Sequence, residues 1–331
     1  MPDVSLARRI VNVTWPCALY LCCSLSMNLL TKTVLTVYGW RSVYTLAASQ
    51  QVFTVALVLG GWAMQIVRLE PMPWRFFWYN VVPMALLNSL NGLIGFVCMQ
   101  LVNMPMYLVL RRLTTFKVML MEIVLLQQEI PDAMQAALLV TTIGSVVAGC
   151  NDATFDGYGY LLVIFQNCCT AMNLVLTKKS NLTPLMLVVV NSAIGMVFCV
   201  PLAMHFEYDD VVDFLANLEH PTQFYSLFVV MSTVCLLYQV AIHLCTIRTS
   251  PLATSVTGNI KDLASTVAGF LMFSDVVITP SNILGVALSF LGAYAFSYVK
   301  YNMLFVPHST VTKPWRLRKA INSPSTKPKA Y

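Results

Sequence analysis

Long apolar stretches follow one another along almost the whole chain, with short polar segments between them. Of the 331 residues, 58% are hydrophobic and 10% are charged, too few charges to cover a soluble globule. A helix of roughly 20 apolar residues spans a bilayer. The sequence therefore predicts an all-α membrane protein of ten transmembrane helices, over residues 12–37, 44–67, 76–99, 104–127, 134–150, 158–177, 184–204, 222–247, 251–273 and 280–299.

Basic residues outside these spans favour one side of the membrane. With a cytosolic N-terminus, the opposite side carries Arg41 and an acidic loop from Glu207 to Glu219. Cytosolic segments are enriched in Lys and Arg, so both termini are predicted to be cytosolic. The net charge of +6 then reflects orientation rather than nucleic-acid binding or lipid recognition. The predicted cytosolic side holds Arg8, Arg9, Arg68, Arg75, Lys178, Lys179, Arg248, Lys300, Lys313, Arg316, Arg318, Lys319, Lys327 and Lys329.

Residue types that carry catalysis or bind metals are scattered along the chain. The ten cysteines lie almost entirely in apolar spans, and their spacing matches neither a disulfide framework nor a metal site. Of the four histidines, only His243 falls within a span, and no acidic residue is near it in the sequence. The sequence therefore predicts no enzyme activity, no cofactor and no metal ion.

The two halves of the chain resemble each other. Met27-Asn28-Leu29-Leu30-Thr31-Lys32 in the first span is echoed by Met172-Asn173-Leu174-Val175-Leu176-Thr177-Lys178 in the sixth. Nearly the same separation relates Pro105 to Pro251, Lys117 to Lys261 and Glu129 to Asp275. We predict two five-helix repeats, residues 12–150 and 151–304, between a cytosolic segment 1–11 and a cytosolic basic tail 305–331. Because each repeat has an odd number of spans, the second is inverted relative to the first.

Lys261 lies inside the ninth predicted span, within Gly258-Asn259-Ile260-Lys261-Asp262. A charge at this depth is costly, so it usually faces a cavity, a partner or a substrate pathway. In inverted-repeat transporters the substrate site lies near the membrane midplane, between the halves. Lys261 and Lys117 are therefore predicted to approach such a site from symmetry-related directions.

Cations within or near the predicted spans outnumber acids there. The cations are Lys32, Arg111, Arg112, Lys117 and Lys261, and the acids are Glu122 and Asp262. Desolvated cations without matching acids favour an anionic ligand, such as one that carries pyrophosphate. Two other interpretations stay open: Lys32, Arg111 and Arg112 can extend to the membrane interface, and Glu122 and Asp262 can pair with cations between helices.

Several short motifs resemble a known transporter family. Pro105-Met106-Tyr107 with Leu110-Arg111-Arg112-Leu113-Thr114 is similar to the fourth-helix pattern of UDP-glucuronic acid/UDP-N-acetylgalactosamine transporters. Thr249-Ser250-Pro251-Leu252 with Thr257-Gly258-Asn259-Ile260-Lys261-Asp262 resembles the ninth-helix motif of that branch, where Gly-x-Ile-Lys-Asn is typical. Gly292 and the segment Tyr294 to Tyr298 fit the closing pattern. From about Leu21 to Tyr301, the chain resembles nucleotide-sugar transporters of the drug/metabolite transporter superfamily.

The resemblance implies an antiporter that moves a cytosolic nucleotide sugar into the Golgi or endoplasmic reticulum and returns a nucleoside monophosphate. By the same resemblance, Lys261 would bind phosphate, with Lys117 or Arg111 opposite. Gly258 and Asn259 would line the pocket.

The choice among substrates rests on departures from a related motif pattern. GDP-mannose transporters carry Gly-Ala-Leu-Asn-Lys in the ninth helix and Phe-Tyr-Asn-Asn in the seventh, whereas this chain has Thr257 to Lys261 and Val189-Val190-Asn191-Ser192 there. A UDP-sugar is therefore favoured, and GDP-mannose or another GDP-sugar is the alternative. Asn191 is predicted either to contact the base or to bond a neighbouring helix. An exporter of cationic drugs with the same fold is a more distant alternative, because it would need an acidic cavity.

The C-terminal residues resemble a sorting signal. Lys327-Pro328-Lys329-Ala330-Tyr331 resembles the cytosolic K-x-K-x-x signal that coat proteins recognise. Lys327 and Lys329 are accordingly predicted to contact a coat protein, and a merely basic tail is the competing interpretation. We expect a multi-pass Golgi protein that cycles with the endoplasmic reticulum. The sequence leaves the oligomeric state open between a monomer and a homodimer.

Overall fold

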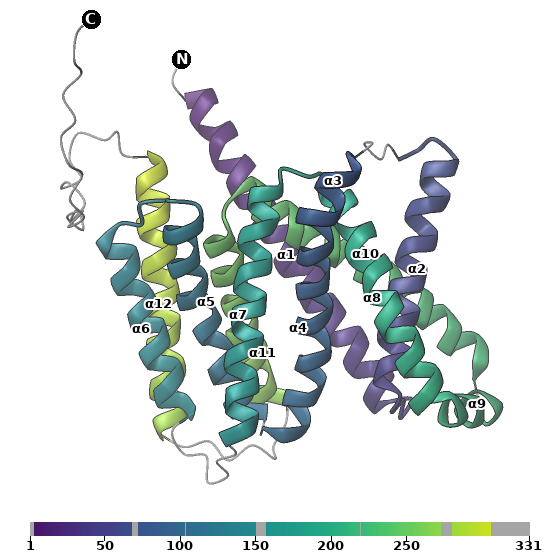
Figure 1. Ribbon diagram of the computed structural model, residues 1–331. Coiled ribbons are helices and arrows are strands. Elements are labelled where there is room, and N and C mark those ends of the chain that lie inside the picture. The colour runs from purple at the N-terminus through teal and green to yellow at the C-terminus, as the bar shows by residue number, and fades with distance from the viewer. Residues whose placement is uncertain are drawn as a thin grey trace, which may run out of the picture.

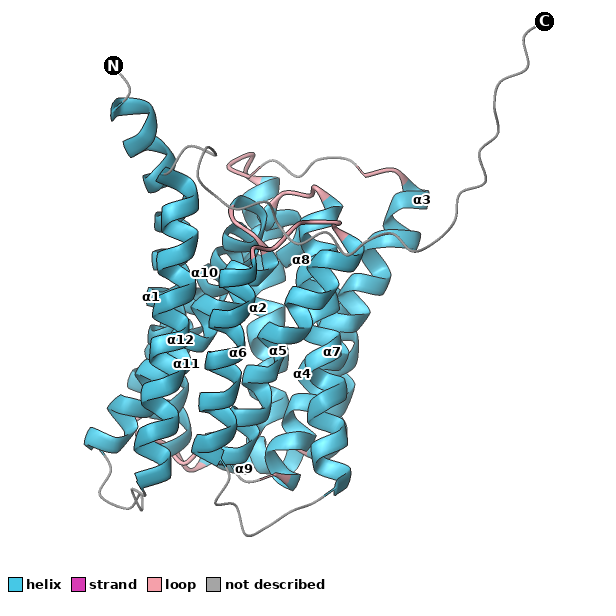
Figure 2. Cartoon of the chain, turned by 90° about the vertical axis from the view of Figure 1, so that its left-hand side faces the viewer, coloured by secondary structure: helices cyan, strands magenta, loops and turns pink. Residues whose placement is uncertain are grey.

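The computed structural model describes residues 3–67, 72–102, 104–149, 157–218, 220–272 and 280–305. In this part of the chain, all regular structure is helical. Most helices run in alternating directions through one bundle, with the connections at its two ends (Figures 1 and 2). The helices are α1 (Asp3–Thr36), α2 (Val43–Ala63), α3 (Trp74–Phe76), η1 (Phe77–Val81), α4 (Val82–Leu101), α5 (Met104–Leu125), α6 (Asp132–Gly149), α7 (Gly157–Ser180), α8 (Pro184–Phe206), α9 (Tyr208–Ala216), α10 (Pro221–Arg248), α11 (Pro251–Met272) and α12 (Pro280–Phe305).

A helix covers each of the ten segments that the sequence predicted to span the membrane. The third segment is continuous but irregular, since α3, the π-helix η1 and α4 follow one another without a break. Pro83 stands in the first turn of α4 and cannot donate a backbone hydrogen bond to the preceding turn, which is where the π-helix lies.

The segment after α8 corrects one sequence prediction. It was expected to be an acidic loop, but residues Tyr208–Ala216 form the short helix α9. Asp209 and Asp210 occupy its first turn, where carboxylates interact favourably with the helix dipole. Glu207, just before α9, accepts hydrogen bonds from the backbone amides of Tyr44 at 3.0 Å and Thr45 at 2.7 Å. This carboxylate therefore joins the end of α8 to the start of α2.

The bundle has the apolar surface of a membrane protein. Five helices of the described chain are long and apolar enough to cross a bilayer: Thr14–Leu35 within α1, α2, α7, α8 and α10. Shorter apolar stretches occupy Asp132–Val147 and Ala287–Val299, within α6 and α12. Large apolar side chains such as Leu161, Val197 and Leu291 are exposed on the outside of the bundle. Such a surface is stable against lipid, so the chain is an all-α membrane protein.

Helices from the two halves of the chain are interleaved. α1 packs on α10, and α4 packs on α7. α2 contacts α8, α5 contacts α11, and α6 makes an extensive contact with α12. The backbones of α6 and α12 are very close at Gly144. A Cβ added to this residue would stand 2.5 Å from the backbone nitrogen of Ser289. Small residues thus let these two backbones approach each other.

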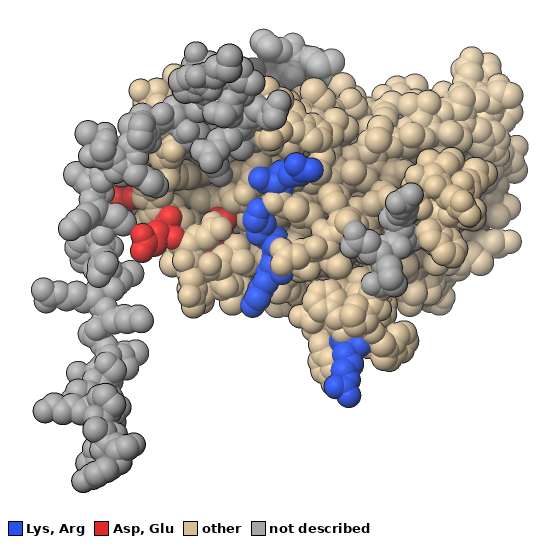
Figure 3. Space-filling view, turned by 90° about the horizontal axis from the view of Figure 1, so that it is seen from above, with Lys and Arg blue, Asp and Glu red and all other residues tan. Residues whose placement is uncertain are grey.

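The two ends of the bundle carry different charges. α1 begins and α12 ends on the upper side in Figure 1, whereas α9 lies on the lower side. The view onto the upper end shows Lys and Arg side chains over the middle of the bundle and at one edge, with Asp and Glu side chains to one side (Figure 3). α7 and α10 end on this side and carry Lys178, Lys179 and Arg248 in their last turns, and α3, which also lies here, carries Arg75. Lys178 donates hydrogen bonds to the carbonyls of Ile247 and Thr249, at the end of α10.

Candidate functional site

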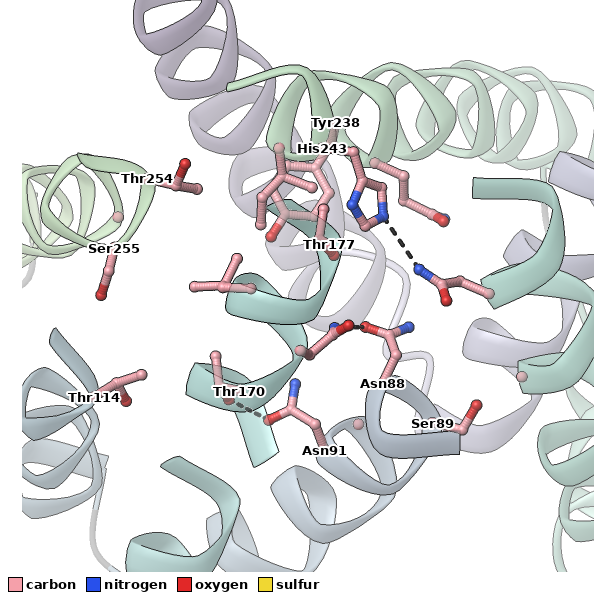
Figure 4. Close-up of a pocket in the computed structure, with 18 of the residues that line it drawn as sticks. Asn88, Ser89, Asn91, Thr114, Thr170, Thr177, Tyr238, His243, Thr254 and Ser255 are labelled. Atoms are coloured by element: carbon pink, nitrogen blue, oxygen red, sulfur yellow. Dashed lines mark hydrogen bonds between the residues drawn. The ribbon is translucent and has the colours of Figure 1, made fainter. Parts of the chain in front are cut away.

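A polar cavity of about 420 Å³ lies inside the bundle. Eight helices line it: α1, α2, α4 and α5 from the first half, and α7, α8, α10 and α11 from the second. Figure 4 shows hydroxyl and amide side chains from several of these helices around a common space, among them Asn88, Thr170 and Ser255. Helices from both halves of the chain therefore border the cavity.

Three charged side chains line the cavity: Arg111 on α5, and Lys261 and Asp262 on α11. The Lys261 Nζ lies 3.0 Å from Asp262 Oδ1. In the part of the chain that the structure describes, Arg111 makes no ion pair; its Nη1 donates to Thr170 Oγ1 at 3.0 Å. The charged lining thus carries one net positive charge.

Arg111 is held by side chains of neighbouring helices. Thr170 Oγ1, which accepts from Arg111, lies 2.6 Å from Asn91 Oδ1, to which it donates. The backbone carbonyl of Asn91 in turn accepts from Gln166 Nε2 at 3.0 Å. This chain of polar contacts joins α4, α5 and α7 and places the guanidinium at the cavity wall. Its position therefore depends on packing among three helices.

The wall contributed by α11 is built from small and polar residues. Gly258 leaves room beside Tyr20, because a Cβ at this position would stand 3.2 Å from the Tyr20 hydroxyl oxygen. Asn259 lines the cavity, and its Nδ2 donates to Thr115 Oγ1 on α5 at 2.8 Å. Thr115 and Ser255 hydroxyls are also 2.8 Å apart. Asn259 therefore ties α11 to α5 as well as bordering the cavity.

Another part of the lining is neutral and rich in amides. Asn191 on α8 is 2% exposed, and its Nδ2 lies 3.2 Å from His243 Nε2 on α10. No hydrogen-bond partner for Asn191 Oδ1 is found among the described residues. Asn173 Nδ2 donates to Asn88 Oδ1 at 2.9 Å. Sequence reasoning did not propose His243 as a cavity residue, although its isolated position within an apolar span was the available signal.

The structure brings most of the predicted site residues together. Lys261, Arg111, Gly258, Asn259 and Asn191 all line the one cavity.

Lys117 is placed differently from the prediction. It does not line this cavity, because its Nζ donates to the Ile164 carbonyl at 2.6 Å and contacts Cys168 Sγ at 3.3 Å. Lys117 lies six positions after Arg111, and six steps of ~100° turn its side chain to another face of α5. Arg111, rather than Lys117, is therefore the cation of α5 in the cavity.

Two other interior charges, Arg112 and Glu122, also lie outside the cavity lining. Arg112 is 4% exposed, and its Nη1 lies 3.4 Å from the hydroxyls of Ser145 on α6 and Ser289 on α12. Glu122 is 1% exposed. The side chain of Lys32 lies outside the described residues, as do Asp275, Lys327 and Lys329. The excess of cations predicted for the interior is therefore distributed over several environments.

A polar cavity between interleaved helices of an apolar bundle is the architecture of a membrane transporter. The model of the Triose-phosphate Transporter family matches residues 11–297, and the chain belongs to this family.

Individual relatives agree with this assignment. The UDP-sugar transporter UST74c of Drosophila melanogaster is 26% identical over 290 residues, which cover 86% of this chain and 77% of the relative. The GDP-mannose transporter GONST1 of Arabidopsis thaliana is 24% identical over 293 residues, which cover 82% of this chain and 85% of the relative. A solved crystal structure shares the fold with a TM-score of 0.65 at 14% identity, covering 88% of this chain and 98% of the other.

These matches confirm the resemblance to nucleotide-sugar transporters that the sequence motifs indicated. The family and these relatives are transporters rather than enzymes, in agreement with the sequence prediction.

Proposed function

We propose that this protein carries a nucleotide sugar, with a UDP-sugar favoured, from the cytosol into the Golgi lumen in exchange for a nucleoside monophosphate. The observation that carries the proposal is the cavity, where Arg111 and Lys261 share one space with the amides of Asn88 and Asn191. Guanidinium and ammonium groups bind phosphate oxygens, and amides can bond a sugar or a base. A volume of about 420 Å³ is in the range of ligand pockets.

Alternating access between two inverted five-helix repeats is the proposed mechanism. In that arrangement α1 corresponds to α7, α4 to α10, α2 to α8, α5 to α11 and α6 to α12. The contact of α1 with α10 then corresponds to that of α7 with α4. The contacts α2–α8, α5–α11 and α6–α12 each join two corresponding helices. This pattern supports a twofold relation, about which the halves could rock to open the cavity to either side.

The proposed orientation has both termini in the cytosol. The basic last turns of α3, α7 and α10 support it, because they lie at the same end of the bundle. Cycling with the endoplasmic reticulum through a coat-protein contact at Lys327 and Lys329 is part of the same proposal. A homodimer is compatible with it.

An exchange assay tests the function. Purified protein in liposomes preloaded with UMP should take up radiolabelled UDP-sugar, and uptake should require the internal UMP. Lys261→Gln and Arg111→Gln should each lower uptake about tenfold or more, because a hydrogen bond to a charged group is worth ~1.5–3 kcal/mol.

Lys117→Gln is the matched control, since this lysine lies in a cavity-forming helix but outside the cavity. It should leave uptake close to that of the wild type. The proposal is contradicted if uptake does not depend on internal UMP, or if neither cavity substitution lowers it.

A GDP-sugar is the second candidate. The buried Asn191 Oδ1, without a partner among the described residues, is an acceptor that guanine could meet with its N1–H and N2–H groups, and uracil with N3–H alone. Melting temperatures of the purified protein with UMP, GMP and CMP separate the candidates, because a ligand that binds the native state raises the melting temperature. The largest rise with UMP supports a UDP-sugar, and the largest rise with GMP supports a GDP-sugar.

A further inference from the structure

A carboxylate of the cavity wall lies beside one of the two cations that an anionic ligand would use. Asp262 Oδ1 is 3.0 Å from Lys261 Nζ, and both residues line the cavity. Neither side chain is fully buried, with exposed fractions of 16% for Lys261 and 28% for Asp262. The ion pair is therefore accessible from the cavity.

The helix backbone does not impose this pair. Adjacent residues on an α-helix point ~100° apart and do not face each other. Contact between Lys261 and Asp262 therefore depends on the flexible ends of their side chains, which meet beside the cavity. Such a contact can separate without any change in α11.

A phosphorylated ligand would require that separation. A phosphate monoester carries about −1.5 to −2 charges at pH 7. Arg111 supplies one positive charge, whereas the charge of Lys261 is compensated by Asp262. Both cations become available to the ligand only when Lys261 leaves Asp262.

We propose that Asp262 is a resident counter-ion of Lys261, which the phosphate of an incoming nucleotide displaces. The inference rests on the proposed function and adds a role for a residue that does not itself bind the ligand. The carboxylate competes with phosphate and lowers ligand affinity. When the ligand leaves, the carboxylate pairs with the ammonium again, so Lys261 is not left as an uncompensated cation. Asp262 thus lowers the affinity for the ligand and raises the rate of exchange.

A double-mutant cycle tests this role. The variants are Asp262→Asn, Lys261→Gln and the double substitution, and the probes are UMP and GMP, with uridine and guanosine as phosphate-free controls. Binding is measured with the purified full chain. Asp262→Asn should tighten binding of the recognised nucleotide about three- to tenfold, a modest gain because a partly exposed ion pair is weak. Nucleoside binding should not change.

Two further comparisons distinguish displacement from a structural role. In the Lys261→Gln background, Asp262→Asn should give no gain in nucleotide affinity. In the exchange assay, Asp262→Asn should lower both KM and the maximal rate, and Asp262→Glu, which keeps the carboxylate, should restore both towards wild type. If the Asn variant does not fold, Asp262→Ser replaces it in the same cycle.

The outcomes separate the two proposals. Weaker nucleotide binding in Asp262→Asn, comparable to that of Lys261→Gln, would show that Asp262 positions the lysine, and the counter-ion role would be overturned while the transport function stands. An equal gain in nucleoside affinity would also overturn it. If neither UMP nor GMP binds the wild-type protein, the proposed function itself fails.

Discussion

At the scale of single residues, three cations of α5 show how neighbours in sequence can have different roles. Arg111 lines the cavity, Arg112 lies between α6 and α12, and Lys117 bonds the Ile164 carbonyl on α7. Their side chains leave the helix in different directions, and each direction meets a different neighbour. Residue type alone therefore does not decide which cation can reach a ligand.

The contact of Arg111 with Thr170 leads to a prediction at this scale. Thr170→Val keeps the shape of the side chain but removes the hydroxyl that accepts from Arg111 and donates to Asn91. We expect the KM for nucleotide exchange to rise about threefold to tenfold, because a typical hydrogen bond contributes ~0.5–1.5 kcal/mol. The exchange assay in liposomes measures it.

Thr233→Val is the matched control, since Thr233 is exposed and its hydroxyl bonds only the Val229 carbonyl of its own helix among the described contacts. It should leave the KM unchanged. An unchanged KM in Thr170→Val would show that this hydroxyl does not position the guanidinium.

At the scale of helices, the sequence located the elements well because the length of an apolar run directly limits where a spanning helix can lie. Two details needed the structure. The start of the third segment contains a π-helix, and the acidic connection after α8 is helical rather than a loop. Both depend on local hydrogen bonds, which hydropathy does not report.

The α6–α12 contact gives the prediction at this scale. Gly144→Ala should lower the free energy of unfolding by ~1–3 kcal/mol, because an added methyl group overlaps the backbone of α12 and closely packed helices accommodate it poorly. A lower melting temperature of the purified protein would show this. Gly60→Ala in α2 is the control, because a Cβ there meets nothing within 4 Å. Equal melting temperatures for both variants would contradict the close contact.

At the scale of the whole molecule, charge is distributed between the two ends of the bundle. Basic last turns of α3, α7 and α10 lie at one end, and α9 with its acidic first turn lies at the other. The α2–α8 contact is reinforced at the α9 end by Glu207, which bonds the first turn of α2. Asp and Glu side chains are also visible at the basic end (Figure 3), so the polarity of the bundle lies in the opposite placement of the basic last turns and α9.

This polarity predicts the topology in cells. In intact Golgi vesicles, a tag appended after Tyr331 should be cleaved by added protease, because the end with the basic residues is expected in the cytosol. A tag inserted between α9 and α10, after Leu218, should be protected until detergent opens the membrane. The reverse pattern of cleavage would contradict the proposed direction of transport.

The sequence by itself determined the membrane class and the position of each apolar helix, because the length and spacing of apolar runs are properties of a linear chain. It also identified Lys261, Arg111, Gly258, Asn259 and Asn191, which line one cavity. Only the tertiary structure decided that Lys117 lies elsewhere, that Asp262 pairs with Lys261 and that His243 contacts Asn191. The physical reason is that the rotation of each helix about its axis, and the identity of the helix opposite, are fixed by packing among distant segments.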